Sequence, residues 1–364
     1  MKRKIFLISN MYPSQEDESY GIFVKNFEDS VKRDGFVITE KAVIAGKGKN
    51  LLSKIRKYLK FYYQILIKGL SSDYDLIYTH YITHSAIPLI LLRVFIKKPL
   101  VLNTHGDDVM VTTTFQRILS KVVKPLVRSS DLVVVPSFFF KEKVVSNFKI
   151  APNKIFVSPS GGVDTQLFKP SPIPNNNSFV IGYMSRIEEG KGWKTFLHAV
   201  SLFKENTTNS VDFKICIIGD GSDRQRMLHE ISRLNLDEVT NYQGRLHQSK
   251  LPIILNQVNL LVFPTLLQES LGLSGLEAMA CGLPVVGSKI GGLTDYIEDG
   301  RNGFFFTPGN PKELCDKILQ FFNLPQSEKD EMMKEARATS LKFDTKAVSS
   351  QLHQRLKNLL TSYN

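Results

Sequence analysis

The sequence predicts an α/β protein built from two doubly wound parallel-sheet domains. Short apolar runs with strand character alternate with helical patterns along nearly all of the 364 residues, which is typical of a parallel sheet with helices on both faces. One stretch without periodicity, KPSPIPNNN at 169–177, interrupts this alternation and indicates an interdomain linker. With 42% hydrophobic residues, a chain of this length has enough apolar side chains for two cores of ordinary size.

Each half of the chain contains six runs that we expect to form strands. In the first half these runs are residues 4–9, 36–44, 76–79, 100–103, 132–135 and 155–157. In the second half they are residues 179–184, 213–218, the surroundings of Tyr242, 260–263, 284–286 and 304–306. We therefore place a first domain at 1–170 and a second at 171–346.

The cysteine count and the length of the apolar runs exclude several classes of protein. Three cysteines, Cys216, Cys281 and Cys315, have neither metal-ligand spacing nor the even number of a disulfide framework, so we expect a reducing, cytoplasmic setting. The apolar run at 5–8 is too short for a signal peptide. The run at 86–96 falls short of the roughly 20 residues that a membrane span needs, so we expect no transmembrane helix.

The net positive charge is confined to the first half of the chain. Residues 1–170 carry 26 Lys and Arg against 14 Asp and Glu, whereas residues 171–364 carry 21 of each, so the net charge of +12 lies in the first half. Such a field attracts nucleic acid, an anionic membrane surface or an acidic substrate. The densest part, 47–68, has the pattern of a basic amphipathic helix, which either lies on a membrane or packs its apolar side on the core. No nucleic-acid-binding motif accompanies the charge, so we rank nucleic acid last.

The segment FPTLLQESLGLSGLEAMACGLPVV at 263–286 contains the strongest signal for a site. An apolar strand closed by Pro264 is followed by a short helix expected at 274–281, so Glu269 precedes the helix and Glu277 lies on it. Two carboxylates placed in this way suit the two ends of an elongated, hydroxyl-rich ligand. On spacing alone, two solvated surface glutamates would be the more common explanation.

The start of the same helix suits a phosphate. The amides of Leu271, Gly272 and Leu273 lie at the helix N-terminus, where unpaired N–H groups and the helix dipole favour an anion. Gly272 and Gly275 have no side chain and therefore leave room for the ligand. A sugar, a diphosphate and a ribose would therefore fit in this order along the segment.

Two cations stand in the turn SRIEEGKG at 185–192, directly after an expected strand. Arg186 and Lys191 lie five positions apart in this glycine-bearing turn, which precedes a helix expected to begin at Trp193. Two such cations can neutralise a diphosphate as it leaves, and an arginine offers a bidentate fork. A solvated turn is the alternative explanation for two charged residues at this spacing.

Glycines in other turns after strands allow the backbone to approach a ligand closely. Gly219 and Gly221 flank an aspartate after the strand at 213–218, and Arg245 follows the next strand. In the first half, Gly21 lies in the turn after the first strand. Alone, these glycine turns are a weak signal for a ligand site.

In the first half, the strand at 100–103 ends in Thr104-His105-Gly106-Asp107-Asp108. A histidine at the end of a strand is placed to contact a ligand, although a lone histidine is more often structural. The two adjacent carboxylates also suit a hard cation such as magnesium.

Together these segments resemble the retaining glycosyltransferases of family 4, which have the GT-B fold of two Rossmann-like domains facing across a cleft. The resemblance covers almost the whole chain, is most specific at 263–286 and is weakest at 47–98. It implies that Glu269 approaches the donor sugar and that Glu277 holds the ribose hydroxyls. It also implies that a final helix, at about 347–364, crosses back onto the first domain.

The resemblance further implies a site for a nucleotide diphosphate sugar of the UDP or GDP type. The residues expected to bind it are Gly21, Arg186, Lys191, Gly219, Gly221, Arg245, Leu271, Gly272, Leu273 and Glu277. The residues expected to take part in transfer are Glu269, His105, Arg186 and Lys191. No metal and no other cofactor is expected, because enzymes of this kind use protein cations in place of magnesium.

We therefore expect a retaining hexosyltransferase that passes sugar to a lipid-linked glycan at the inner face of a bacterial plasma membrane, in surface polysaccharide synthesis. The basic first half suits a lipid diphosphate acceptor and peripheral contact with anionic lipid. It also suits a small anionic acceptor such as malate. A sugar-nucleotide-binding subunit that has lost turnover is the alternative of another class, and specific nucleic-acid binding is not expected.

Overall fold

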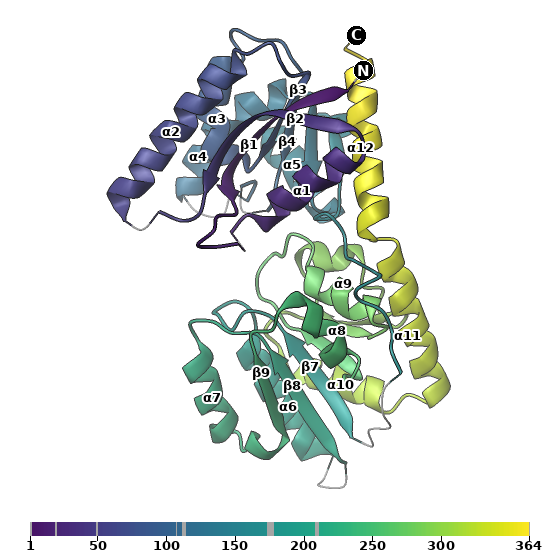
Figure 1. The fold of residues 1–364 in the computed structure, drawn as a ribbon. Helices are drawn as coiled ribbons and strands as arrows, with labels where there is room; N and C mark the ends of the chain where they lie inside the picture. Colours follow the sequence, from purple (N-terminus) through teal and green to yellow (C-terminus); the bar gives the residue numbers. More distant parts are fainter. Residues whose placement is uncertain are drawn as a thin grey trace. The chain divides into compact units, whose positions relative to one another are not determined.

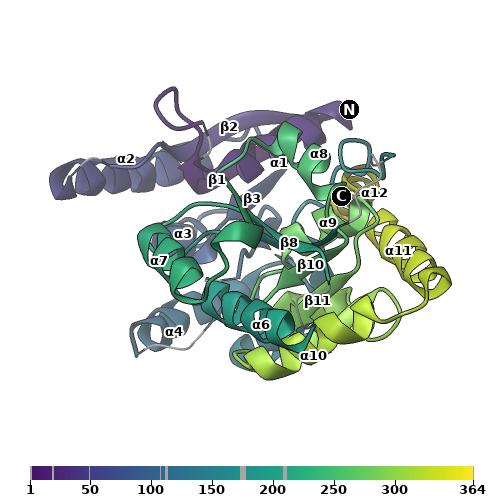
Figure 2. The ribbon, with the colours of Figure 1, turned by 90° about the horizontal axis from the view of Figure 1, so that it is seen from below.

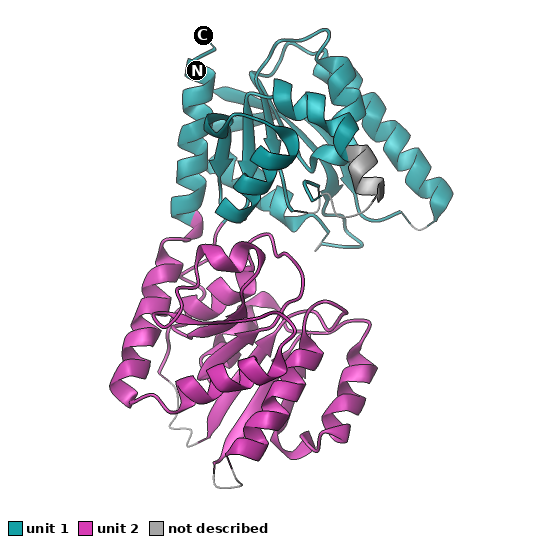
Figure 3. Cartoon of the chain, turned by 180° about the vertical axis from the view of Figure 1, so that it is seen from behind, with its two compact units in different colours: residues 1–161, 346–364 teal, residues 162–345 magenta. Residues whose placement is uncertain are grey.

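The computed structural model describes residues 2–18, 20–48, 50–106, 108–110, 114–172, 178–207 and 211–363, with the backbone alone at 114–119. The chain forms two compact units, one of Met1–Gly161 with Lys346–Asn364 and one of Gly162–Thr345 (Figure 3). Each unit contains one six-stranded parallel sheet covered by helices on both faces (Figure 1). The expected fold class, two doubly wound α/β units, is therefore confirmed.

The division between the units lies at Gly161 and Gly162, earlier in the chain than the 170/171 boundary expected from the sequence. Val163 and Phe168 are buried in a core of the second unit, so the segment before the Pro/Asn-rich stretch already belongs to that unit. The expected linker therefore does not mark the boundary. Its residues 173–177 lie outside the described residues.

The sheet of the first unit has the strand order β2-β1-β3-β4-β5-β6, with all neighbours parallel. Its strands are β1 Arg3–Tyr12, β2 Phe36–Ala45, β3 Leu76–His80, β4 Leu100–Asn103, β5 Leu132–Val135 and β6 Ile155–Val157. Its helices are α1 Ile22–Arg33, α2 Leu51–Gly69, α3 Ile82–Leu92, α4 Thr114–Ser129, α5 Phe138–Phe148 and α12 Thr345–Thr361.

Alternating side chains of β1 fill two cores, one on each face of this sheet. Phe6 and Ile8 pack with residues of α2 and α3, whereas Ile5 and Leu7 pack with Val24 of α1 and with α12. Contacts with α1 hold α12 in place, because the His353 side chain lies 3.3 Å from both the Ser30 hydroxyl and the Asp34 carboxylate. In Figure 1, α12 runs beside α1 in the first unit.

The sheet of the second unit has the order β12-β11-β10-β7-β8-β9, again fully parallel. Its strands are β7 Phe179–Met184, β8 Phe213–Ile218, β9 Thr240–Gly244, β10 Leu260–Phe263, β11 Val285–Ser288 and β12 Gly303–Phe306. Its helices are α6 Trp193–Asn206, α7 Arg224–Arg233, α8 Leu251–Leu255, α9 Leu273–Ala280, α10 Pro311–Phe322 and α11 Gln326–Leu341.

Two cores also cover the faces of the second sheet. Phe196 of α6 and Leu314 of α10 pack on one face, and Leu276 of α9 and Ala336 of α11 pack in the other core. Figure 2 shows α6 and α10 on the side of the strands opposite to α9. The continuous apolar runs of β7 and β10 follow from this double burial, since both faces of these central strands are covered.

Candidate functional site

The strand orders locate one topological switch point in each unit. In the second sheet the chain runs outward from β7 through β8 and β9, and then returns to place β10 on the other side of β7. In the first sheet the order reverses between β1 and β3. Ligands of open parallel sheets bind at the carboxyl ends of the strands beside such a point, because the two outgoing turns diverge there.

In the second unit, the turn after β7 packs tightly against the loop after β10. The Leu266 N–H donates to the Gly190 carbonyl oxygen at 2.7 Å. Gly192 has a positive φ of 76°, and a Cβ there would overlap the carbonyl oxygen of Pro264. The glycines of this turn are therefore required for the close approach of two segments that are far apart in the chain.

Lys191 and Glu269 form an ion pair at this switch point. The Lys191 Nζ lies 2.8 Å from Glu269 Oε1, and both side chains are largely shielded from solvent. The Thr265 hydroxyl, which is fully buried, donates to the same carboxylate oxygen at 2.7 Å. The pair therefore presents a fixed cation and a fixed carboxylate, held by the ends of β7 and β10.

Arg186 occupies the same turn but not the same pair. Its guanidinium is 67% exposed and lies 2.8 Å from the Glu188 carboxylate, two residues along the chain. The Lys191 side chain, in contrast, lies on the buried side of the turn. Both cations of the turn are thus paired with carboxylates, Arg186 at the exposed surface and Lys191 in a largely buried position.

The start of α9 is built to leave backbone N–H groups accessible. Gly272, the N-cap residue, has a φ of 82°, and no side chain of the described residues caps this end. The Tyr296 hydroxyl donates to the Gly272 carbonyl oxygen at 3.0 Å, and Gly275 leaves space for the Tyr296 ring. Leu271 is buried and anchors the loop. The helix N-terminus is thus fixed in position and free for an anion.

Glu277, on α9, is partly buried, and this burial raises its pKa to about 7. The Gln248 side-chain amide donates to Glu277 Oε1 at 3.4 Å and opposes the shift. A carboxyl group with such a pKa changes its charge near neutral pH. Its oxygens are available to accept hydroxyl donors once it is ionised.

The turns after β8 and β9 complete this edge of the second sheet. Gly219 has a φ of 139°, and its N–H donates to the Gly244 carbonyl oxygen at 2.8 Å. A Cβ on Gly219 would overlap the Ser185 carbonyl oxygen, and one on Gly221 would overlap that of Ile187. Arg245, next to Gly244, is exposed. The turns after β7, β8, β9 and β10 therefore form one continuous rim.

In the first unit, aromatic side chains gather at the carboxyl ends of β1, β3 and β4. The rings of Phe23 and His105 lie 4.5 Å apart, and the imidazoles of His80 and His105 stack at 5.2 Å. Tyr81 has an unusual positive φ of 60°, and its ring lies 4.6 Å from that of His105. Gly21 packs so closely on the end of β1 that a Cβ would lie 2.6 Å from the Met11 carbonyl carbon.

His105 is held as a neutral side chain. Burial lowers its pKa to about 3, and burial together with His105 lowers the pKa of His80 well below its usual value. Nδ1 of His80 lies 3.0 Å from Nε2 of His105, so one of the two rings donates to the other. A neutral imidazole can orient a hydroxyl group but contributes no charge of its own.

Asp108 organises the loop after β4. Its carboxylate accepts from the His105 and Gly106 N–H groups at 2.9 and 3.2 Å and from Ile82 N–H at 3.2 Å. Burial nevertheless raises its pKa to about 6. Asp107, its partner in the expected carboxylate pair, lies outside the described residues. Asp108 thus binds the backbone of the loop that bears His105.

Sequence reasoning missed three residues that support the expected site residues. Thr265 binds Glu269, Gln248 binds Glu277, and His80 stacks on His105. Thr265 follows the proline that closes β10, and His80 ends β3, so the position of each at a strand end was the signal available. Gln248 begins a short 3-10 helix, Gln248–Lys250, after β9 and carried no such signal.

Two family models match the chain in succession. One described as Glycosyltransferase Family 4 matches residues 22–167, and one described as Glycosyl transferases group 1 matches residues 164–339. The first covers most of the first unit. The second covers the rim formed by the turns after β7 to β10.

The chain spans between 28% and 67% of the length of the curated relatives described by these matches. The uncharacterized glycosyltransferase MJ1178 of Methanocaldococcus jannaschii is 25% identical over 253 residues, which are 70% of this chain and 67% of that protein. The N-acetyl-alpha-D-glucosaminyl L-malate synthase of Bacillus anthracis is 25% identical over 68% of this chain and 65% of its own. The capsular polysaccharide biosynthesis glycosyltransferase CapM of Staphylococcus aureus is 27% identical over 54% of this chain and 53% of its own.

Solved structures share the fold over nearly the whole chain. Sucrose-phosphate synthase from Thermosynechococcus elongatus superposes with a TM-score of 0.78 at 19% identity, covering 99% of this chain and 100% of that one. Anabaena HepE in complex with UDP gives a TM-score of 0.76 at 21% identity, covering 98% and 100%. At these identities the likeness concerns the fold.

Proposed function

Because the chain belongs to the retaining glycosyltransferases of family 4, which have the GT-B fold and transfer a sugar from a nucleotide sugar, we propose that it passes a hexosyl unit to a lipid-linked glycan. The product would belong to a surface polysaccharide: an exopolysaccharide, a capsule, an O-antigen or a teichuronic acid. The observation that carries the donor half of this proposal is the Lys191–Glu269 pair at the β7/β10 switch point.

The donor would lie along the rim of the second unit. We assign its diphosphate to Arg186, Lys191 and the backbone N–H groups at Leu271, Gly272 and Leu273. The exposed guanidinium, the fixed ammonium and the uncapped helix start all attract an anion. These groups supply positive charge where the leaving diphosphate gains negative charge.

The remaining donor contacts follow from the same placement. We assign the ribose hydroxyls to Glu277 and the nucleotide to the turns of Gly219, Gly221 and Arg245. These residues lie farther along the rim. Glu269 would orient the transferred sugar through its hydroxyls. The roles of His105 and Gly21, which belong to the first unit, rest on the family resemblance alone, by which the neutral His105 would contact the sugar and Gly21 the diphosphate.

The proposed transfer proceeds on one face of the sugar. The bond between the anomeric carbon and the diphosphate oxygen breaks, and the electron pair stays on the diphosphate beside Lys191 and Arg186. The acceptor hydroxyl attacks the same face, and its proton passes to that diphosphate oxygen. The protein cations fill the role that a metal ion fills in other transferases, so we expect activity in EDTA.

Two observations support a lipid-linked acceptor at a membrane surface. The net positive charge of the chain lies within residues 1–170, and an anionic lipid diphosphate would be attracted to it. CapM, a relative over about half of its length, is a capsular polysaccharide enzyme by name. Among the described residues no helix combines the length and the apolar character of a membrane span. We propose peripheral attachment to the cytoplasmic face of the plasma membrane.

Release of nucleoside diphosphate tests the proposed reaction. UDP, GDP and ADP sugars are each incubated with the protein in EDTA, with and without a bacterial lipid extract. We expect one donor to support release and the lipid extract to increase it strongly. Because HepE was solved with UDP, UDP sugars are the first donors to examine. Folded protein that releases nothing from any donor, with any extract, would contradict the transferase with a lipid acceptor.

Glu277 gives this proposal a pH signature. Ribose hydroxyls donate to an ionised carboxylate, and burial raises the Glu277 pKa to about 7, so nucleoside diphosphate affinity is expected to rise as the pH increases through 7. Glu277→Gln should weaken binding at pH 8 by about tenfold and leave only the pH dependence that comes from the ligand's own terminal phosphate. Titration calorimetry with UDP and GDP at pH 5.5 and pH 8 measures both effects.

The same substitution should stabilise the protein at high pH. A carboxyl group whose pKa is higher in the folded than in the unfolded protein destabilises the fold once it ionises. The loss in free energy of unfolding therefore grows between pH 4.5 and about pH 7 and reaches its full size above pH 7. Glu277→Gln is therefore expected to gain about 1–3 kcal/mol at pH 8 and little at pH 5. Equal stability of the two proteins at pH 8 would contradict the raised pKa.

A small anionic acceptor is the second candidate. The malate synthase of Bacillus anthracis is 25% identical over 68% of this chain, and malate would suit the same basic first unit. Addition of malate and other small anions to the release assay, in the absence of lipid, separates the candidates. Stimulation by malate alone would favour the small acceptor over the glycan.

A further inference from the structure

One side of α2 exposes a row of apolar side chains to solvent. Leu51, Ile55, Leu59, Tyr63 and Ile67 recur at every fourth position, and their exposed fractions are 75%, 48%, 66%, 64% and 53%. Residues four apart are neighbours on a helix surface, so these five form one ridge that runs obliquely along almost all of α2. With ~1.5 Å of rise per residue, the 19-residue helix is on the order of 28 Å long. We call these five side chains the α2 ridge.

Cations border the α2 ridge without acidic neighbours on the same helix. The sequence of α2, LLSKIRKYLKFYYQILIKG, contains five Lys and Arg and no Asp or Glu. Lys54, Arg56 and Lys60 are exposed and pair with no carboxylate in the part of the chain that the structure describes. Arg56 and Lys60 stand three positions before Leu59 and Tyr63, a spacing that makes them neighbours of the ridge on the helix surface. The surface is therefore both apolar and positively charged.

The opposite side of α2 is held by the rest of the unit. Phe61 and Ile65 are buried in the core, and the Lys57 ammonium donates to the Ala45 and Gly46 carbonyl oxygens at 2.7 and 3.0 Å. The exposure of the ridge is thus not a consequence of a loosely attached helix. The same contacts place the first half of α2 beside the carboxyl end of β2, the edge of the sheet that bears the His105 loop.

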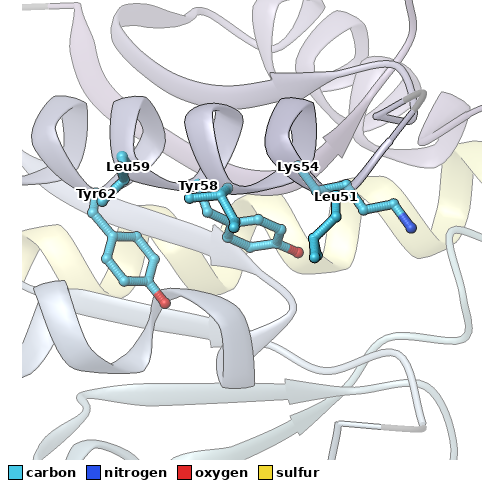
Figure 4. A pocket seen from close by; sticks show the side chains of 6 residues that line it. Leu51, Lys54, Tyr58, Leu59 and Tyr62 are labelled. Carbon is cyan, nitrogen blue, oxygen red and sulfur yellow. The ribbon is translucent and has the colours of Figure 1, made fainter.

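A shallow apolar groove of about 350 Å³ runs beside this first half of α2. It is lined by Leu51, Lys54, Ile55, Tyr58, Leu59 and Tyr62. Figure 4 shows the Tyr58 and Tyr62 rings directed to one side of the helix, with the Lys54 ammonium at its N-terminal end. The groove enlarges the apolar surface next to the ridge.

We propose that α2 docks on an anionic lipid bilayer, with the α2 ridge inserted among the acyl chains and Lys54, Arg56 and Lys60 at the head groups. An apolar stripe with flanking cations and no acidic residue matches this surface in both polarity and charge. A protein partner of ordinary composition would not require the complete absence of carboxylates. Docking would bring the carboxyl edge of the first sheet to the membrane surface. The functional role of this docking rests on the proposed lipid-linked acceptor.

Cosedimentation with vesicles tests the docking in the absence of donor and acceptor. The full chain is mixed with vesicles of phosphatidylcholine alone or of phosphatidylcholine with phosphatidylglycerol, at low and at moderate salt. We expect binding to the anionic vesicles and little to the neutral ones. Arg56→Gln/Lys60→Gln should weaken that binding roughly 30-fold at low salt. Its matched control, Lys214→Gln/Lys312→Gln, removes the same charge from exposed positions of the second unit and should bind as the parent does.

The ridge itself is tested by Leu51→Gln/Leu59→Gln. Glutamine retains the helix propensity but not the apolar surface, so binding to anionic vesicles should fall about tenfold or more. The control Ile253→Gln/Leu341→Gln, at exposed positions of the second unit, should leave binding unchanged. Tryptophan placed at Leu59 (Leu59→Trp) should shift its fluorescence to shorter wavelength on vesicles, which reports insertion directly.

Several outcomes would overturn the proposal. The first is that the parent protein stays in the supernatant with anionic vesicles. The second is that the ridge variant binds these vesicles as well as the parent does, which would mean that charge alone causes the binding. A change from dimer to monomer in the ridge variant without lipid would make the ridge an interface between copies. Nucleoside diphosphate release assayed on the same samples keeps the questions separate, since failure of release with intact vesicle binding would reject the proposed reaction and not the docking.

Discussion

Lys191→Met is expected to lower kcat by about 10³-fold, because it removes the fixed cation proposed to stabilise the leaving diphosphate. Methionine keeps much of the length and volume of the lysine stem. The change also leaves Glu269 without the ammonium that lies 2.8 Å away, in a largely buried position. We therefore expect a second effect, a loss of about 3 kcal/mol in the free energy of unfolding. Steady-state release assays and urea unfolding measure the two effects separately.

The double variant Lys191→Met/Glu269→Gln distinguishes catalysis from stability. Glutamine removes the unpaired charge and can still accept the hydrogen bond from Thr265. Its free energy of unfolding should return to within about 1 kcal/mol of the parent value. Turnover should stay as low as in the single variant or fall further, since the cation is still absent. Recovery of kcat in the double variant would show that Lys191 serves only to neutralise Glu269.

The same pair shows how much of the site follows from the sequence. Lys191 and Glu269 are separated by 78 positions, and their residue types in turns after strands predicted a site for each. Their pairing depends on β7 and β10 being neighbours, which the doubly wound strand order places together. The resemblance implied the fold, but the strand order itself was not predicted. No local pattern would have supplied the contact.

Arg186 marks the limit of such reasoning. The sequence placed it with Lys191 on the diphosphate, yet its partner is Glu188, two residues away. The charges of both residues are visible in the sequence, but the direction of an exposed side chain depends on the shape of the turn. The sequence can thus indicate that a charged turn residue belongs to a site, but not with which residue it forms an ion pair.

Strand prediction succeeded where strands are covered on both faces. The bounds of β7 and β10 agree with the apolar runs 179–184 and 260–263. β9 was indicated only by Tyr242, although it spans Thr240–Gly244, because it lies at the sheet edge and its residues are mostly half-exposed. The division between the compact units also lies earlier than the expected 170/171 boundary. Composition indicated the Pro/Asn-rich stretch, whereas the boundary depends on where Val163 and Phe168 pack.

Gly192→Ala is expected to disrupt the second unit far more than its backbone angle alone would explain. Gly192 has a φ of 76°, and a Cβ there would overlap the Pro264 carbonyl oxygen. To relieve this overlap, the turn after β7 has to move away from the loop after β10. We expect a loss of more than about 4 kcal/mol, or no folded second unit.

Gly300→Ala provides the matched control for this substitution. Gly300 lies in the same unit with a φ of 78°, but a Cβ there meets nothing within 4 Å. Its cost should be limited to the left-handed backbone, about 1–2 kcal/mol. Thermal unfolding compares the two variants, and any Gly192→Ala protein that folds should have lost UDP and GDP binding, since Lys191 is the adjacent residue. An equal loss of stability in Gly192→Ala and Gly300→Ala would contradict this prediction. It would mean that the turn after β7 has room for a side chain at position 192, so that its close contact with the loop after β10 is not required for the Lys191–Glu269 pair.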